Sequence, residues 1–245
     1  MRSHGEAPLV FEELEAAAPA AREPALLAAL SPGSYLAEEF RVLRAKVRVI
    51  AQRTPFRCIG LVSAAPGEGK TTVALGLAAS MAQEPERRVL LVEADLRKRS
   101  IAGYLGLEPT RGLSEWLQGD AADAVPVRRL GPAGPYLLAG GLSSPDTPER
   151  IAPARVAQLL EAGRRCFDDV VVDCPPLTPV ADSVLLQEAL DGLLVVVRAR
   201  STPRETLVRA LSHLNPARVH GLVFNDYREY FTHVYRYPHR PYGDD

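Results

Sequence analysis

Long apolar runs, cysteine and a surplus of one charge are all scarce in this sequence of 245 residues. No apolar run approaches the ~18 residues that a bilayer-spanning helix needs. The 29 basic and 30 acidic residues nearly cancel, so overall charge favours neither nucleic acid nor an anionic membrane as a partner. Of the three cysteines, two lie in or beside apolar runs, where cysteine behaves as a small hydrophobe. This odd number of cysteines predicts a reduced, cytoplasmic compartment, and because the N-terminus is acidic we expect no signal peptide.

A phosphate-binding loop is the strongest signal that is present. The apolar run 58–62 precedes Ser-Ala-Ala-Pro-Gly-Glu-Gly-Lys-Thr-Thr over 63–72, and a helical pattern follows. The two glycines let the backbone curl with its N–H groups toward phosphate oxygens, and the helix start adds its positive dipole. The lysine is expected to reach the β and γ phosphates of ATP, and the first threonine to meet Mg²⁺. The expected nucleotide contacts are Gly67, Glu68, Gly69, Lys70, Thr71 and Thr72.

This loop departs from the pattern G-x-x-x-x-G-K-[ST] at one position, because Ala64 replaces the first glycine. The alternative is an ordinary glycine-rich turn that carries an exposed lysine. Strand, loop, lysine, paired threonines and helix occur in the order that a P-loop requires, so we predict binding of a nucleoside triphosphate.

Strand-like and helix-like segments alternate along the rest of the chain. Several of the strands are apolar on both faces, as in a parallel sheet covered by helices. The sequence therefore predicts a doubly wound, mainly parallel α/β domain with ligands at the carboxyl ends of its strands. Strands are expected near 58–63, 88–93, 135–139, 168–173, 192–198 and 219–225. Helices are expected near 35–50, 70–83, 151–165, 182–190 and 203–214.

Three regions divide the chain. Residues 1–33 mix Ala, Pro and Glu without sustained periodicity and are expected to form a flexible arm. Residues 34–226 form the predicted nucleotide-binding domain, whose first helix has Ser34 as its N-cap. Residues 227–245 form a tail that holds five of the eight tyrosines. Scattered aromatic residues usually pack on a surface, but five in one terminal segment are harder to explain in that way.

Carboxylates follow two of the apolar strands. Glu93 and Asp95 come at the end of the run from 89, and Asp173 ends the run from 170. Alternation in an extended chain would put Glu93 and Asp95 on the same side. A single acidic residue in such a place is usually a turn residue. Two strands that end in this way behind a P-loop favour Mg²⁺ binding and catalysis instead.

With these motifs the chain resembles the bacterial tyrosine kinases of capsule and exopolysaccharide export, over about residues 31 to 245. Residues 66–72 are similar to their Walker A motif, 90–97 to Walker A′ and 170–176 to Walker B. The family usually has Asp where this chain has Glu93. The resemblance implies Lys70, Glu93, Asp95 and Asp173 as catalytic residues. It implies Thr71, Asp95 and Asp173 at the metal, and Asn225 near adenine.

The resemblance also implies how the protein works with others. The tail corresponds to the family's autophosphorylated cluster, with Tyr227, Tyr230, Tyr235, Tyr237 and Tyr242 as acceptors. A pattern E-x-x-R-x-x-R on the first helix implies a subunit contact through Glu38, Arg41 and Arg44, in an oligomer expected to be a ring. Further expected partners are an integral-membrane polysaccharide co-polymerase, which would recruit the protein to the inner face of the membrane, and a protein-tyrosine phosphatase.

Two alternatives to the kinase remain. One is a partitioning-type switch ATPase, whose relatives carry a lysine five residues before the Walker lysine. This chain has Ala65 there and no basic helix at its end, which argues against it. The other is a nucleotide-sensing adaptor that binds ATP without transferring phosphate, which would be consistent with Glu93.

Overall fold

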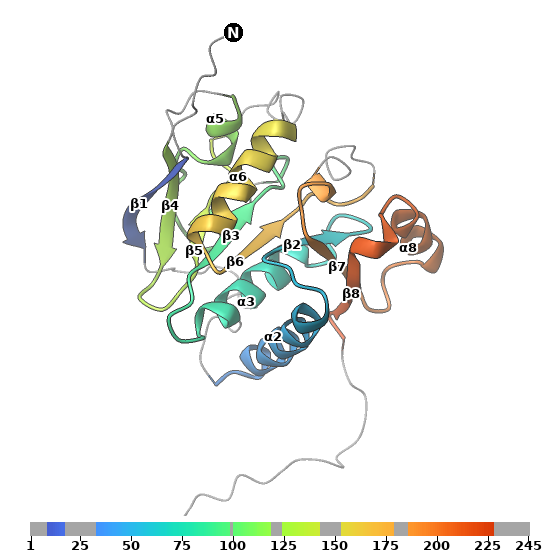
Figure 1. Cartoon of the computed structure of the whole chain (residues 1–245). Helices are drawn as coiled ribbons and strands as arrows, with labels where there is room; N and C mark the ends of the chain where they lie inside the picture. The colour runs from blue at the N-terminus through green and yellow to red at the C-terminus, as the bar shows by residue number, and fades with distance from the viewer. Residues whose placement is uncertain are drawn as a thin grey trace, which may run out of the picture.

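A single eight-stranded sheet forms the centre of the protein, in a computed structural model that describes residues 9–17, 33–98, 100–118, 124–142, 153–178 and 186–227. The strand order is β1-β4-β5-β3-β6-β2-β7-β8 (Figure 1). The strands are β1 (Val10–Ala17), β2 (Cys58–Ser63), β3 (Val89–Glu93), β4 (Ala124–Leu130), β5 (Tyr136–Leu138), β6 (Asp169–Asp173), β7 (Gly192–Arg198) and β8 (Val219–Asn225).

The six strands from β5 to β8 run parallel to one another, which brings the carboxyl ends of β3, β6, β2, β7 and β8 to one edge of the sheet. β4 pairs antiparallel with β5, and β1 runs parallel to β4, so these two strands run opposite to the other six. These six are the strands expected from the sequence. The predicted doubly wound, mainly parallel α/β fold is thus confirmed.

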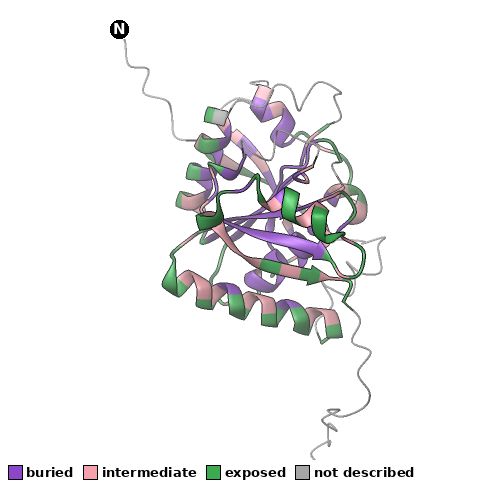
Figure 2. Cartoon of the chain, turned by 90° about the vertical axis from the view of Figure 1, so that its right-hand side faces the viewer, coloured by how far each residue is buried: buried purple, intermediate pink, exposed green. Residues whose placement is uncertain are grey.

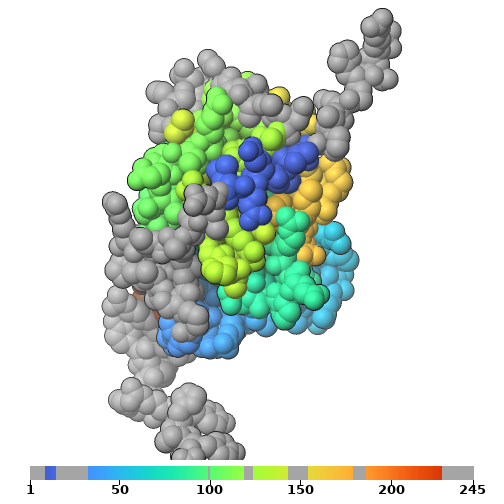
Figure 3. Space-filling view, turned by 90° about the vertical axis from the view of Figure 1, so that its left-hand side faces the viewer, coloured from blue at the N-terminus to red at the C-terminus, as the bar shows by residue number. Residues whose placement is uncertain are grey.

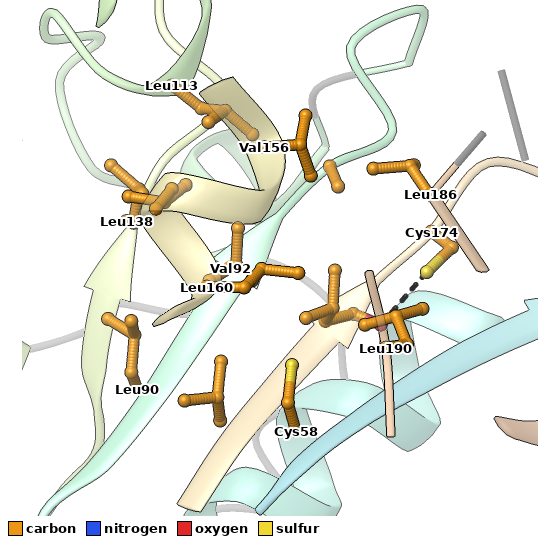
Figure 4. Close-up of a cluster of buried hydrophobic side chains, with 14 of the residues drawn as sticks. Cys58, Leu90, Val92, Leu113, Leu138, Val156, Leu160, Cys174, Leu186 and Leu190 are labelled. Carbon is orange, nitrogen blue, oxygen red and sulfur yellow. Dashed lines mark hydrogen bonds between the residues drawn. The ribbon is translucent and has the colours of Figure 1, made fainter. Parts of the chain in front are cut away.

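Helices cover both faces of this sheet. They are α2 (Tyr35–Arg53), α3 (Lys70–Ala82), α4 (Ile101–Tyr104), α5 (Leu113–Gln118), α6 (Pro153–Cys166) and α8 (Arg204–Leu211), with a 3-10 turn η2 (Pro216–Arg218) before β8. One hydrophobic core lies under α5, α6 and α8, and a second under α2, α3 and α4. Figure 4 shows part of the first core, where Cys58 and Cys174 lie among leucine and valine side chains.

The N-terminal segment differs from the expectation of a flexible arm. Residues 10–17 form β1, which runs parallel to β4 at the edge of the sheet. Figure 3 shows β1, in blue, on the surface beside the yellow-green segment that includes β4. The rings of Phe11 and Phe167 form a T-shaped pair with their centroids 5.1 Å apart, and Leu9 is buried. Pairing and these apolar contacts stabilise a strand that its own composition does not reveal.

At the opposite edge, β8 is half exposed whereas its neighbour β7 is buried (Figure 2). The first long helix, α2, begins as expected, because the Ser34 hydroxyl accepts a hydrogen bond from the Ala37 amide at 3.1 Å. Of the helix expected over 182–190, residues 182–185 lie outside the described residues, and of the remaining five only 186 and 187 are helical. Among the described helices, none has both the length and the apolar content that a bilayer span would need.

Candidate nucleotide site

The predicted P-loop connects the buried strand β2 to the start of α3. Gly67 and Gly69 have φ angles of 83° and 86°, a left-handed conformation that favours glycine. Gly69 is the N-cap of α3 and offers no side-chain hydrogen bond to the first turn. The amide groups at this helix start therefore have no side-chain cap, as expected of a turn whose donors serve an anion.

Lys70 lies in a buried cluster of opposite charges. Its Nζ atom is 2.7 Å from Oδ1 of Asp173 at the end of β6 and 3.5 Å from Oδ2 of Asp95, beyond β3. Burial alone would lower the pKa of Lys70, but the two aspartates outweigh burial and raise it. Lys70 is therefore held as a cation at the mouth of the loop.

Thr71 and Asp173 form the part of the site that suits a metal ion. The Thr71 hydroxyl donates to Oδ2 of Asp173 at 2.8 Å, and the Asp173 side chain is fully buried. Burial raises the pKa of Asp173, while Lys70 and the Thr71 hydroxyl oppose that rise. One hydroxyl, one carboxylate and nearby phosphates are the hard oxygen ligands that Mg²⁺ takes in phosphoryl-transfer sites, so this donor set fits Mg²⁺.

Glu93 occupies a different environment from Asp95. Its carboxylate is buried and accepts hydrogen bonds from the amides of Ile101, at 2.6 Å, and Gly140, at 2.8 Å. Burial raises the pKa of Glu93, against the effect of these amides. Because β3 ends at Glu93, strand alternation does not continue to Asp95. The two carboxylates therefore contact different groups, and only Asp95 lies beside Lys70.

Asn225 lies against the P-loop, at the end of β8. Its Nδ2 atom donates to the backbone oxygen of Glu68 at 2.9 Å. Among the described residues, the carbonyl oxygen of this amide has no hydrogen-bond partner. The structure thus brings Asn225 to the same edge of the sheet as Lys70 and Asp173, and its contact with adenine stays a prediction.

The residues expected at a subunit contact do not share one role. Glu38 and Arg41 form an ion pair at 3.1 Å on the surface of α2, where their side chains are 51% and 58% exposed. Arg44 instead turns toward its own domain, where it donates to the Ser80 backbone oxygen and lies 3.6 Å from Glu84. In this chain Arg44 joins α2 to the end of α3.

Of the five tail tyrosines, only Tyr227 belongs to the described residues, and it is exposed. Tyr230, Tyr235, Tyr237 and Tyr242 lie outside them. Sequence reasoning missed two loop threonines that contact the P-loop. The Thr178 hydroxyl donates to the backbone oxygen of Ala64, and the Thr202 hydroxyl donates to the Glu68 carboxylate. Neither threonine belongs to a recognisable motif, so no local signal could have found them.

Comparison with known proteins identifies relatives of this chain. The family model described as "CobQ/CobB/MinD/ParA nucleotide binding domain" matches residues 59–236. The succinoglycan biosynthesis transport protein ExoP of Rhizobium meliloti is 35% identical over 203 residues, which cover 80% of this chain but 25% of that protein. This chain therefore spans about a quarter of the length of that relative.

One further relative and one solved domain are of similar size to this chain. Tyrosine-protein kinase YwqD of Bacillus subtilis is 29% identical over 185 residues, which cover 76% of this chain and 78% of YwqD. The solved kinase domain of the Escherichia coli tyrosine kinase ETK superposes with a TM-score of 0.73 at 26% identity, covering 86% of this chain and 84% of that domain. The resemblance to bacterial tyrosine kinases is thereby confirmed.

Proposed function

We propose that this chain, which belongs to the CobQ/CobB/MinD/ParA nucleotide binding domain family, is an ATP-dependent protein-tyrosine kinase that acts in exopolysaccharide or capsule production. The observation that carries the proposal is the cluster of Lys70, Thr71, Asp95 and Asp173 at the mouth of the P-loop. The relatives named as tyrosine kinases support the choice of acceptor.

The residues of this cluster have separate tasks in the proposed reaction. Lys70 binds the β and γ phosphates and offsets the charge that develops as the γ-phosphoryl group leaves ADP. Thr71 and Asp173 would hold Mg²⁺, with Asp95 near it. When bound, Mg²⁺ supplies the positive charge that neutralises the phosphate oxygens.

The acceptor tyrosine needs a base, because a free phenol has a pKa of about 10. Asp95 suits this task better than Glu93, because both oxygens of Glu93 already accept hydrogen bonds from backbone amides. In this scheme the phenolic oxygen forms the new bond to phosphorus, and its proton passes to Asp95.

Asn225 and the surface of α2 complete the proposal. In this proposal the carbonyl oxygen of Asn225 would accept a hydrogen bond from the amino group of adenine. The exposed pair Glu38 and Arg41 would contribute to a ring-shaped homo-oligomer. A membrane co-polymerase would recruit the protein to the inner face of the cell membrane, and a protein-tyrosine phosphatase would reverse the modification.

Replacement of Lys70 by Met tests this function. We expect Lys70→Met to reduce tyrosine phosphorylation to background, since the phosphate charge is no longer neutralised. The measurement is transfer of label from γ-labelled ATP, with circular dichroism to confirm the fold. Arg209→Met, on the exposed side of α8, is the matched control and should keep wild-type activity. Undiminished labelling of Lys70→Met would refute the assignment.

A nucleotide-binding adaptor is the second candidate, and the engaged carboxylate of Glu93 favours it. The same assay separates the two functions. A wild-type protein that binds Mg·ATP but transfers no phosphate to tyrosine, with or without a membrane activator, would support the adaptor.

A further inference from the structure

Glu68 is a buried acidic residue of the P-loop that the proposed chemistry does not use. One oxygen of its carboxylate accepts a hydrogen bond from the Ala65 amide at 3.2 Å, inside the loop. The other accepts from the Thr202 hydroxyl, and the Glu68 backbone oxygen accepts from Asn225. One loop residue is thus held at three points, and two of them come from the far end of the chain.

Thr202 and Asn225 lie at the carboxyl ends of the neighbouring strands β7 and β8. A tight turn follows β7, in which the amides of Ser201 and Thr202 both donate to the Arg198 backbone oxygen. Arg200 within this turn has a φ angle of 60°, a left-handed conformation uncommon for a residue with a side chain. The turn therefore fixes where the Thr202 hydroxyl points.

The two strand ends are also joined to each other. The Ala199 amide donates to the Asn225 backbone oxygen at 2.9 Å, and Arg198 forms an ion pair with Asp226 at 3.0 Å. The backbone of Asp226 is also in the left-handed conformation, with a φ angle of 55°. Because Thr202 and Asn225 share this corner, they form one support.

This support lies very close to the backbone that binds phosphate. A Cβ atom placed on Gly69 would come 1.8 Å from Nδ2 of Asn225. Gly69 directly precedes Lys70 and caps α3. A loop held in its binding conformation loses little entropy when the nucleotide binds, so such contacts act on affinity.

We propose that Thr202 and Asn225 are positioning residues, which hold the P-loop in its nucleotide-binding conformation through Glu68. The inference rests on the nucleotide binding proposed above. Asp226 of the same corner precedes Tyr227, so the support also connects the P-loop to the root of the tyrosine-rich tail. Neither Thr202 nor Asn225 needs to contact phosphate for this effect.

Thr202 offers the cleanest test, because its hydroxyl can be removed without a change in side-chain size. We expect Thr202→Val to weaken binding of Mg·ADP about tenfold, since the buried Glu68 carboxylate loses a donor. Thr202→Ser keeps the hydroxyl and should restore affinity to within about twofold of wild type. Thr206→Val is the matched control, because among the described residues the Thr206 hydroxyl has no hydrogen-bond partner.

Calorimetry on the full chain gives the affinities, and kinase assays give KM for ATP and kcat separately. The positioning role predicts a higher KM with kcat within about twofold of wild type, in a variant that remains folded at the assay temperature without nucleotide. Wild-type affinity in Thr202→Val, or equal loss in Thr202→Ser, would overturn the proposal. So would a Thr202→Val protein that is already partly unfolded at the assay temperature without nucleotide, because unfolding would then explain the lost affinity. A wild-type chain that binds no Mg·ADP would instead refute the nucleotide function itself.

Discussion

The Glu93 carboxylate holds two backbone segments that border the candidate nucleotide site. Its two oxygens hold the amides of Ile101, at the start of α4, and Gly140, in the loop after β5. Both segments border the carboxyl edge of the sheet, where Lys70 and Asp173 lie. The family's usual aspartate is one methylene shorter, so it could not keep both contacts without movement of the backbone.

Glu93→Asp is therefore expected to destabilise this protein. One of the two amides would lose its partner in a buried place, at a cost of about 1 to 3 kcal/mol in the free energy of unfolding. Urea unfolding measures the change, with the exposed Glu39→Asp as a control for the same substitution on the surface. If both variants have the same urea midpoint of unfolding as the wild type, the Glu93 carboxylate does not stabilise this edge of the sheet.

The sequence located the site residues whose relative positions are set within a short stretch of the chain. The P-loop is contiguous, so its glycines and Lys70 follow from the motif, and Asp173 follows from its place at a strand end. The partners of Glu93 could not be predicted, because Gly140 lies 47 residues away and offers only a backbone amide. Thr202 could not be predicted for the same reason, since its contact with Glu68 depends on where the ends of two strands lie relative to each other.

At the scale of elements, α2 is fixed to the domain by one face and exposes the other. Arg48 contacts Asp169 at 2.6 Å and Glu84 at 2.6 Å, and Arg44 reaches the end of α3. The sequence pattern identified this helix and its cap, but periodicity could not show which arginines turn inward. Likewise β1 and β4 were missed, because the pairing of β1 with β4 and of β4 with β5 is a tertiary effect.

Charge reversal at Arg41 and at Arg44 should consequently have different effects. Arg44→Glu would face Glu84 and is expected to lower the free energy of unfolding by about 2 kcal/mol, through lost hydrogen bonding and repulsion. Arg41→Glu disturbs only an exposed ion pair, which is worth about 0 to 1 kcal/mol. Thermal unfolding compares the two, and equal losses of stability would contradict the division of roles.

Asp191 joins three elements and makes stability depend on pH. Its carboxylate accepts hydrogen bonds from the amides of Arg57 and Cys58, before and at the start of β2, and from Arg164 of α6. Burial alone would raise the pKa of Asp191, but Arg164 and the two amides lower it. Its stabilisation is therefore complete above the ordinary aspartate pKa of about 3.9 and is lost as pH falls through the lowered value.

Asp191→Asn is expected to reduce stability by about 1 to 3 kcal/mol at pH 7, where the wild-type carboxylate is charged. The difference between wild type and variant should shrink as the pH falls below about 4. Unfolding by urea at several pH values measures this difference. A gap that stayed constant down to acid pH would show that the charge of Asp191 contributes nothing.

At the scale of the whole molecule, charge balance is the property that autophosphorylation would alter most. The chain carries a formal net charge of −1, and its tail holds five tyrosines. Each phosphate adds about −1.5 to −2 charges at neutral pH, so a fully modified tail would be strongly acidic. The root of this tail, at Asp226 and Tyr227, lies beside the nucleotide edge of its own subunit, and Tyr227 is exposed.

We expect the tail tyrosines to be the principal acceptors of phosphate. A segment that carries several phenols can present one after another to an active site. Mass spectrometry of the active protein would identify the modified residues, with Lys70→Met as the unmodified reference. Phosphate found only outside residues 227–242 would contradict this expectation.

Assembly should loosen as phosphate accumulates, if each tail enters the site of the next subunit. Head-to-tail contacts of one kind close into a ring when the rotation permits, and α2 presents Glu38 and Arg41 for such a contact. Phosphorylated tails would leave the neighbouring site and repel one another. Sedimentation velocity should therefore show oligomers for the unphosphorylated protein, and smaller species both for the phosphorylated protein and for Arg41→Glu. Because Arg44 serves its own domain, Arg41 is the residue to reverse, and an identical oligomer in all three samples would rule the mechanism out.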